Sequence, residues 1–327
     1  MRRFLTRWLD PFVALLLLTL GVAAVLPPVG WFAEFLDDVR GVIIAVVFLS
    51  AGLRISPSAT WKGVKAWRLQ GLTLAVTFVF LPVVAGLFAL LAAQVVNREL
   101  VTGLLFLGAL PSVVQTSVTF VSMARGNTAA AICAASLSNL IGVLATPLLV
   151  LVTIGSYAGI GIGQVAEVLV QILLPFALGQ ALHSRLGNWA GRHAVAVRWI
   201  DRGAVLMIVY SAFGAAIAGG VWQRLPATEL LVVAGVCATL LAIALTTTYL
   251  GSGALGFAIA DRSVITFCGS EKSLTTGLPM SAILFTGPLA GVVIIPVIIY
   301  HQMQLIACSL IARKLGDRAP ASLSPAA

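Results

Sequence analysis

The chain has 327 residues, of which 60% are hydrophobic and only 9% are charged, and its mean hydropathy is +1.07. Because a soluble domain carries about 25% charged residues, this composition excludes a soluble protein and predicts a polytopic membrane protein. The net charge of +9 does not indicate nucleic-acid binding, since the basic residues fall in short clusters between apolar spans and form no continuous face or tail.

Sequence motifs for catalysis, disulfide bonds and metal binding are absent. The chain has no GxSxG, HExxH or phosphate-binding loop, so the sequence predicts no enzyme and no resident cofactor. The four cysteines lie within apolar spans and form no CxxC pair. This pattern indicates buried packing rather than a disulfide framework or a zinc site.

Ten apolar stretches are candidates to cross a bilayer, which requires about 20 residues in a helix. Their expected bounds are 10–28, 41–55, 68–94, 99–123, 128–154, 164–184, 203–221, 228–257, 262–285 and 287–312. The first stretch reaches Pro27 without a small-residue cleavage pattern, so we interpret it as a transmembrane helix rather than a signal peptide. Residues 315–327 are expected to form a disordered cytoplasmic tail.

The distribution of basic residues orients these spans. With the N-terminus in the cytoplasm, the inner segments contain 16 of the 20 Lys and Arg residues, and Lys272 lies within the ninth span. This asymmetry follows the positive-inside bias and predicts an even number of spans with both termini cytoplasmic. We therefore expect a multi-pass protein in the lipid bilayer of a cell membrane, plasma or inner.

Ten spans divide into two sets of five, in residues 1–158 and 159–314. Because five is odd, the second set enters the membrane from the opposite side, which is the geometry of an inverted repeat in secondary transporters. In each half the fourth span is interrupted by polar residues, in LPSVVQTSVTF and in CGSEKSLTTGLPM. Interrupted segments at matching positions indicate the binding site of such a transporter.

The fourth span combines a proline with a dense run of hydroxyl and amide side chains. Proline removes a backbone hydrogen bond and disfavours helix at the preceding residue, and in lipid an opened turn is tolerated only where it faces protein or water. One interpretation is a kinked helix whose hydroxyls bond to their own backbone, and the other is a ligand site. The candidate site residues are Ser112, Gln115, Thr116 and Ser117.

The ninth span places Glu271 and Lys272 next to each other inside an apolar segment. A charged side chain there costs about 2.5–3.5 kcal/mol on insertion scales. Adjacent positions on a helix do not face each other, so the two charges pair well only if the backbone leaves the helix, which Gly269 makes easy. The alternatives are a structural ion pair and a transport or ligand site. Further candidate residues of that site are Ser273, Thr275 and Thr276.

Two polar residues of other spans are also candidates. Asn139 in the fifth span carries an amide that needs partners when buried, and it could face the fourth span. His301 in the tenth span is either a core residue with satisfied hydrogen bonds or, if it lines a cavity, a proton acceptor. The second interpretation rests on the ordinary pKa of imidazole, about 6.5.

The run PSVVQTSVTFVSMARGN, followed by a polar span ending in ATPLL, resembles the fourth and fifth helices of the bile acid:sodium symporter family. The runs FCGSEKSLTTGLPM and YHQMQ resemble its sodium/bile acid cotransporter 7-like branch. The resemblance implies an all-α polytopic fold of ten transmembrane helices in two inverted five-helix repeats. It also implies a panel of spans one, two, six and seven, a core of the other six, and broken helices four and nine that cross near the midplane.

The resemblance further implies transport of an organic anion, bile-acid-like or a small carboxylate, with sodium and by alternating access. Two of the family's sodium-binding side chains match Ser117 and Glu271. The residues that stand at the other ligand positions are Val118, Ala131, Ala135 and Thr275. Oxygen-bearing substitutes nearby are Thr116, Ser136 and Asn139.

Three hypotheses about function follow. In one, the Lys272 ammonium takes the place of a sodium ion beside Glu271, and a sodium-independent or proton-coupled carrier results, in which Lys272 titrates or holds the anionic substrate. In another, the protein is a symporter whose sodium ion binds rearranged ligands. The third is of a different class, namely a membrane regulator of calcium handling or envelope assembly that transports nothing itself.

Overall fold

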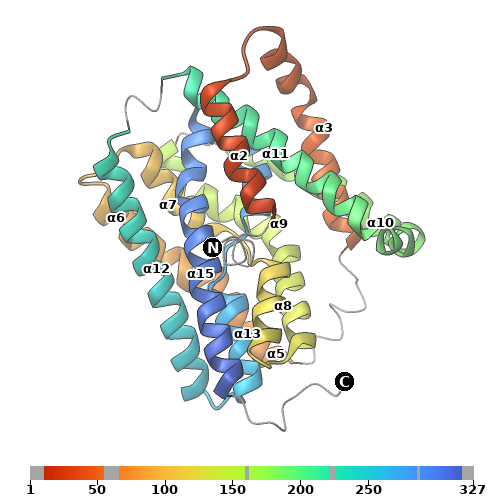
Figure 1. Ribbon diagram of the computed structural model, residues 1–327, viewed down its shortest axis with the longest axis vertical. Helices are drawn as coiled ribbons and strands as arrows, with labels where there is room; N and C mark the ends of the chain where they lie inside the picture. Colours follow the sequence, from red (N-terminus) through yellow and green to blue (C-terminus); the bar gives the residue numbers. More distant parts are fainter. Residues whose placement is uncertain (1–10, 55–65, 159–161, 221–224, 286–287, 319–327) are drawn as a thin grey trace, which may run out of the picture. The chain divides into compact units, whose positions relative to one another are not determined.

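The computed structural model describes residues 11–54, 66–158, 162–220, 225–285 and 288–318, and every regular element in these ranges is a helix (Figure 1). The elements are α2 (Pro11–Val25), α3 (Trp31–Arg54), α5 (Trp67–Ala75), the π-helical turn η1 (Val76–Phe80), α6 (Leu81–Ala92), α7 (Arg98–Ala109), α8 (Val114–Met123), α9 (Thr128–Ala158), α10 (Ile162–Arg192), α11 (Ala194–Ala218), α12 (Ala227–Ala254), α13 (Ile259–Ser270), α14 (Leu274–Leu284) and α15 (Pro288–Arg318).

Helices lie at all ten stretches that the sequence predicts as spans. Within the described ranges, six helices are long and apolar enough to cross a membrane, and the bent pair α7–α8 makes a seventh. α2 is apolar but has only 15 residues, and the first half of α3 carries several charged side chains. The protein is therefore a multi-pass membrane protein, whereas the count of ten spans stays a prediction.

Several helices extend beyond the predicted spans. α3 begins at Trp31, well before the predicted span 41–55, α11 begins at Ala194 before 203, and α10 continues to Arg192 beyond 184. α15 continues to Arg318, into the tail 315–327 that was predicted to be disordered, and residues 319–327 lie outside the described ranges. In each case the helix continues through charged residues that a criterion of apolar length excludes.

The chain divides into two compact units, each assembled from separate stretches of sequence. The first combines Met1–Ser56, Ile160–Ala227 and Gly277–Ile295, and thus contains α2, α3, α10, α11, most of α14 and the first part of α15. The second combines Pro57–Gly159, Thr228–Thr276 and Pro296–Ala327, and contains α5 to α9, most of α12, α13 and the second part of α15. Both units therefore take helices from both halves of the chain.

The first unit is built around the crossing of α3 and α10. Gly52 of α3 and Gly179 of α10 face each other there, and a Cβ atom at either position would overlap with the opposite backbone, at Phe176 or at Leu49. Gln180 adds a hydrogen bond from Nε2 to the Gly52 carbonyl oxygen (2.6 Å). Small residues that allow helix backbones to approach closely are typical of helix pairs in membranes.

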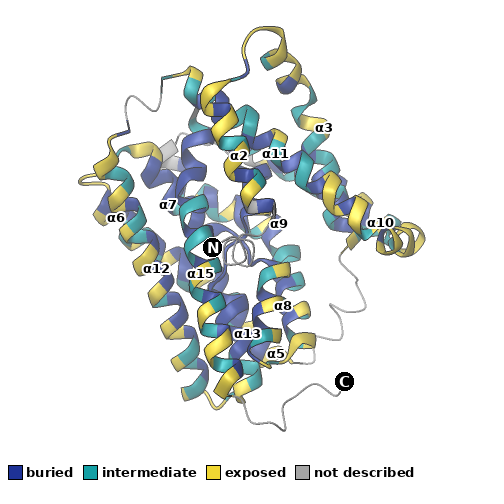
Figure 2. Cartoon of the chain, viewed as in Figure 1, coloured by how far each residue is buried: buried dark blue, intermediate teal, exposed yellow. Residues whose placement is uncertain are grey.

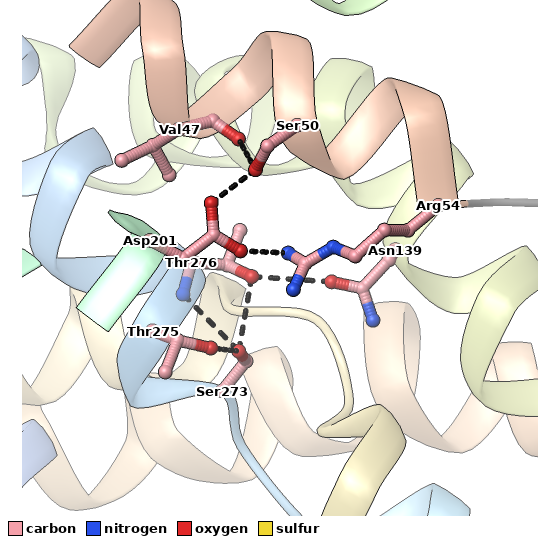
Figure 3. A network of polar contacts seen from close by, with 8 residues as sticks. All are labelled: Val47, Ser50, Arg54, Asn139, Asp201, Ser273, Thr275 and Thr276. Atoms are coloured by element: carbon pink, nitrogen blue, oxygen red, sulfur yellow. Dashed lines mark hydrogen bonds and ion pairs between the residues drawn. The ribbon is translucent and has the colours of Figure 1, made fainter. Parts of the chain in front are cut away.

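A buried carboxylate joins α11 to the last turn of α3 within the same unit (Figure 3). Asp201 is 7% exposed, accepts a hydrogen bond from the Ser50 hydroxyl and pairs with Arg54 (Nη2 to Oδ2, 2.5 Å). The Arg54 side chain is 45% exposed, so its guanidinium stays in contact with solvent while it compensates the buried charge. This contact fixes α11 against α3.

In the second unit, α13 is the central helix. Its residues from Ser263 to Ser270 are all buried, and it packs against α5, α8 and α9 (Figure 2). α5 and α6 are joined through η1, whose wider turn departs from regular α-helical hydrogen bonding. α7 packs against α6, η1 and α9. This packing surrounds the segment after α13 with the ends of several helices.

We expect Gly179→Ala to destabilise the protein, because the added methyl group meets the α3 backbone and overpacking costs about 1–3 kcal/mol. Gly191→Ala is the matched control on the same helix, since open space surrounds its Cβ position. Thermal unfolding of the purified full chain in detergent measures both variants. A Tm for Gly179→Ala as high as that of Gly191→Ala would contradict the close crossing of α3 and α10.

Candidate functional site: two interrupted helices in the second unit

The fourth predicted span is interrupted at residues 110–113, as the sequence predicts. α7 ends at Ala109, α8 begins at Val114, and the two helices are bent by 60°. Leu110 has extended backbone angles (φ −71°, ψ 148°), which a proline favours at the residue before it. The break leaves the last carbonyl groups of α7 and the first amides of α8 in need of partners.

The ninth predicted span is interrupted at residues 271–273, which we call the linker. α13 ends at Ser270, Glu271 has extended backbone angles (φ −73°, ψ 143°), and α14 begins at Leu274. The Ser273 hydroxyl oxygen accepts a hydrogen bond from the Thr276 amide (3.2 Å), which is the usual contact of a serine that caps a helix N-terminus. The second break predicted from the sequence is therefore confirmed.

Hydrogen bonds join the two interrupted segments to each other and to α9. The Ser273 amide donates to the Pro111 carbonyl oxygen (2.8 Å). The Ser112 amide donates to Ser138 Oγ (3.0 Å), and Asn139 Nδ2 donates to the Ser112 carbonyl oxygen (2.8 Å). These contacts satisfy backbone groups that have no water to bind inside a membrane.

Lys272 is 1% exposed, and its ammonium binds main-chain oxygens. Nζ donates to the carbonyl oxygens of Thr77 (2.9 Å), Gly108 (2.7 Å) and Leu110 (2.8 Å), which we call the carbonyl triad. An ammonium has three N–H donors, so the triad uses them all. Gly108 and Leu110 form the C-terminal end of α7, where the unpaired carbonyls carry partial negative charge.

Glu271 is fully buried, and its carboxylate faces the first turn of α8. Oε2 accepts hydrogen bonds from Thr116 Oγ1 (2.8 Å) and Ser117 Oγ (2.6 Å), and the Ser112 hydroxyl lies 3.4 Å from that of Ser117. None of the residues that the structure describes donates to Oε1. A buried polar atom without a partner is uncommon in native proteins, which makes Oε1 a candidate position for a ligand.

The two adjacent charged side chains therefore bind the two helix ends at the other interruption, the start of α8 and the end of α7. Successive side chains of an extended segment point to opposite sides, so Glu271 reaches the start of α8 and Lys272 reaches the end of α7. An anion at a helix N-terminus and a cation at a C-terminus are each stabilised by about 0.3–1 kcal/mol, and by up to about 2 kcal/mol when partly buried. The structural ion pair considered from the sequence is not formed, because each charge has separate partners.

Residues of α15 bind main-chain groups of the linker and of Ser270 before it, and of the α15 residues the sequence predicts only His301 as a site residue. Gln304, which is fully buried, accepts from the Lys272 amide at Oε1 (2.8 Å) and donates from Nε2 to the Lys272 carbonyl oxygen (3.0 Å). The Tyr300 hydroxyl donates to the Ser270 carbonyl oxygen (2.8 Å). The polar run YHQMQ in an apolar helix is the sequence signal for these contacts.

A second polar network contains most of the remaining predicted residues (Figure 3). The Thr276 hydroxyl donates to Asn139 Oδ1 (3.1 Å), and Ser273 Oγ lies 3.0 Å from Thr276 Oγ1 and 3.2 Å from Thr275 Oγ1. Gln115 is exposed on α8 and does not belong to either network. Apart from Gln115, the structure thus brings together the predicted residues of both interrupted spans, Asn139 and, through Gln304, His301.

A sequence model of the SBF-like CPA transporter family matches residues 10–317, which is nearly the whole chain. The chain belongs to this family. It is accordingly a transporter-family membrane protein and not an enzyme, as the absence of catalytic motifs predicts.

Individual relatives support the assignment to this family. The chain is 38% identical to "Uncharacterized protein PA2026" of Pseudomonas aeruginosa PAO1 over 94% of this chain and 93% of the relative. It is 37% identical to "Putative symporter YfeH" of Escherichia coli K12, over 95% and 94%. It is 26% identical to "Sodium/bile acid cotransporter 7" of Mus musculus, over 92% and 90%. The resemblance stated from the sequence motifs is therefore confirmed.

The oxygen atoms around Glu271 fit a coupling cation in part. Thr116, Ser117 and Ser112 supply hydroxyl oxygens beside the carboxylate. Ala131 and Ala135, which stand at two ligand positions implied by the family resemblance, are buried and carry no side-chain oxygen. Hard cations prefer several oxygen ligands, so this group suits a proton or a sodium ion with few protein ligands.

We expect Lys272→Met to lower stability by about 3 kcal/mol or more, because the methionine keeps the apolar stem but leaves three buried carbonyls without their charged donor. Lys314→Met on exposed α15 surface is the control for the loss of one positive charge. Thermal unfolding of the two purified variants gives the comparison. If Lys272→Met unfolded at the Tm of Lys314→Met, the contact between the ammonium and the carbonyl triad would be refuted.

Proposed function

We propose that the protein is a secondary active transporter that carries an organic anion by alternating access, coupled to a cation that binds at Glu271. The observation that carries the proposal is the buried carboxylate, one oxygen of which has no hydrogen-bond donor in the described ranges, beside two interrupted helices. Carboxylates inside membrane segments are costly and mark ion pathways. The family assignment and the words "symporter" and "cotransporter" in the names of relatives support the same function.

The two compact units support the alternating-access part of the proposal. The first unit contains the helices of the expected panel together with most of α14 and the start of α15, and the second contains the rest of the expected core together with the site. We propose that the second unit moves as a body relative to the first. In this proposal the chain comprises two inverted five-helix repeats, 1–158 and 159–314, with both termini in the cytoplasm. Interrupted helices at matching positions of two repeats are typical of transporters of this kind.

Charge balance supports symport of a cation with an anion. The charges of Glu271 and Lys272 cancel within the second unit, so a bound monovalent cation alone leaves one positive charge uncompensated. An uncompensated buried charge is costly. A monovalent organic anion bound nearby restores neutrality, so each ion favours binding of the other, which is the thermodynamic requirement for coupling.

The polar side chains around the interrupted segments support an organic anion, bile-acid-like or a small carboxylate, as the substrate. Gln115 and Thr275 are exposed, and Thr116, Asn139 and Thr276 are half-buried. Hydroxyl and amide groups donate hydrogen bonds to carboxylate oxygens without adding a second fixed charge to the site. An anionic substrate would thus be bound by neutral donors and balanced by the coupling cation.

A second candidate, sodium-independent or proton-coupled transport, is favoured by the position of Lys272. Its ammonium already provides a fixed positive charge at the interrupted helices, bound to the carbonyl triad. A proton on Glu271 needs no shell of oxygen ligands, and Val118, Ala131 and Ala135 provide none from their side chains. In this version Lys272 stays on the triad through the cycle, and Glu271 binds and releases the proton.

Uptake into liposomes under separate sodium and proton gradients tests the proposal, with a labelled bile acid and a labelled small carboxylate as probes. We expect Glu271→Gln to reduce gradient-driven uptake by more than about tenfold, since loss of 1.4 kcal/mol of coupling already gives that factor. Glu99→Gln is the control, because Glu99 lies exposed in the first turn of α7 in the same unit.

The gradients distinguish the two versions. Uptake that requires sodium and ignores pH identifies sodium as the coupling ion, and sodium should then raise the Tm of the wild type but not of Glu271→Gln. Uptake driven by the proton gradient alone identifies the proton-coupled version. Wild-type rates in Glu271→Gln would contradict both, and no uptake of either probe would contradict the proposed substrate class.

A further inference from the structure

We propose that Gln304 is the positioning residue of the linker and that neutral His301 holds Gln304 in place, so that a proton on His301 releases the linker. The geometry stands on its own, whereas its consequence for transport rests on the proposed function. The main-chain N–H and carbonyl of Lys272 have no other hydrogen-bond partner among the described residues than the Gln304 amide.

The orientation of the Gln304 amide follows from that peptide group. Its Oε1 accepts from the Lys272 N–H (2.8 Å), and its Nε2 donates to the Lys272 carbonyl oxygen (3.0 Å). Reversing the amide would place its NH₂ against the Lys272 N–H and its oxygen against the Lys272 carbonyl. Both contacts would be repulsive, so only one orientation satisfies the linker.

This orientation in turn fixes the state of His301. Its Nδ1 lies 2.9 Å from Gln304 Nε2, an NH₂ group that can only donate. Nδ1 must therefore accept, which requires a neutral imidazole with its proton on Nε2. A second proton would turn Nδ1 into a donor facing a donor. No orientation of the amide then satisfies both His301 and Lys272, so protonation and the linker contact exclude each other.

None of the other titratable side chains buried in the described part of the second unit forms a hydrogen bond with the Gln304 amide, so their protonation does not act on the contact between Gln304 and Lys272. Glu271 and Lys272, on the linker itself, bind Thr116 with Ser117 and the carbonyl triad. The remaining groups are Cys237 on α12, Cys268 on α13, and Tyr300 and Cys308 on α15. In the proton-coupled version of the proposed function Glu271 also binds a proton, but it is present in both the wild type and a His301 variant, so comparing the two isolates the contribution of the imidazole.

Release of the linker would affect the ion site, because the Lys272 amide that Gln304 binds belongs to the peptide bond that joins Glu271 to Lys272. Without the Gln304 contact, the two charges lose the support that directs one to α8 and the other to α7. His301 would therefore act as a second proton-sensitive group, which reaches the Glu271 site through Gln304 and does not bind the ion itself.

Hydrogen exchange of the peptide containing residues 268–276 tests the inference in the purified full chain. The matched variant is His301→Asn, whose Oδ1 can accept from Gln304 as Nδ1 does but does not titrate in this range. We expect exchange in the wild type to become about tenfold faster relative to His301→Asn when the pH falls from about 7.5 to about 5.5. Measuring both proteins at each pH cancels the intrinsic dependence of exchange on pH.

Gln304→Leu provides the second measurement, since it removes the contact and should expose the same peptide to fast exchange at both pH values. A constant ratio between the wild type and His301→Asn would overturn the role of His301. Wild-type protection in Gln304→Leu would overturn the role of Gln304. Neither measurement involves transport, so these failures are distinct from a failure of Glu271→Gln to alter uptake.

Discussion

The contact between the Lys272 ammonium and three main-chain carbonyls is the interaction on which the second unit depends. An interrupted helix inside a membrane leaves backbone groups that no water can reach, so protein groups must satisfy them. Lys272 satisfies two carbonyls at the end of α7 and one in η1 with a single side chain. The extended backbone that brings it there turns its neighbour Glu271 toward α8, where Thr116 and Ser117 donate hydrogen bonds to the carboxylate.

The same arrangement explains why two opposite charges adjacent in sequence need not neutralise each other by direct contact. Glu271 faces a helix N-terminus and Lys272 a helix C-terminus, so each charge lies at the helix end of opposite partial charge. The two charges sum to zero at the site. Lys272 uses all three donors of its ammonium, whereas none of the described residues donates to Oε1 of Glu271. This difference is the reason why we propose Glu271, and not Lys272, as the ion-binding residue.

The sequence predicts the features that depend on local chemistry. Pro111 and the polar run after it identify the first interruption, and the intramembrane charges identify the second. The partners of Lys272 could not be predicted, because they are carbonyl groups of residues such as Gly108 and Leu110, and main-chain atoms have no signature in the sequence. The role of Gln304 was missed for a related reason, since its partner is the peptide group of a residue distant in the chain.

Helix boundaries were missed where helices continue beyond the apolar stretch. α3 includes charged residues before position 41, and α15 continues to Arg318, because packing and helix propensity extend a helix past the point where hydropathy falls. The crossing of Gly52 with Gly179 also depends on tertiary contact, since glycine alone does not reveal which backbone approaches it.

An experimental structure of the protein in lipid, determined with sodium and without it, tests the central claim most directly. The account predicts that the Lys272 side chain reaches the carbonyl oxygens of Thr77, Gly108 and Leu110 in both conditions, and that any ion binds on the Glu271 side of the linker. Lys272 turned toward Glu271, with a sodium ion bound to those carbonyls in its place, would contradict it.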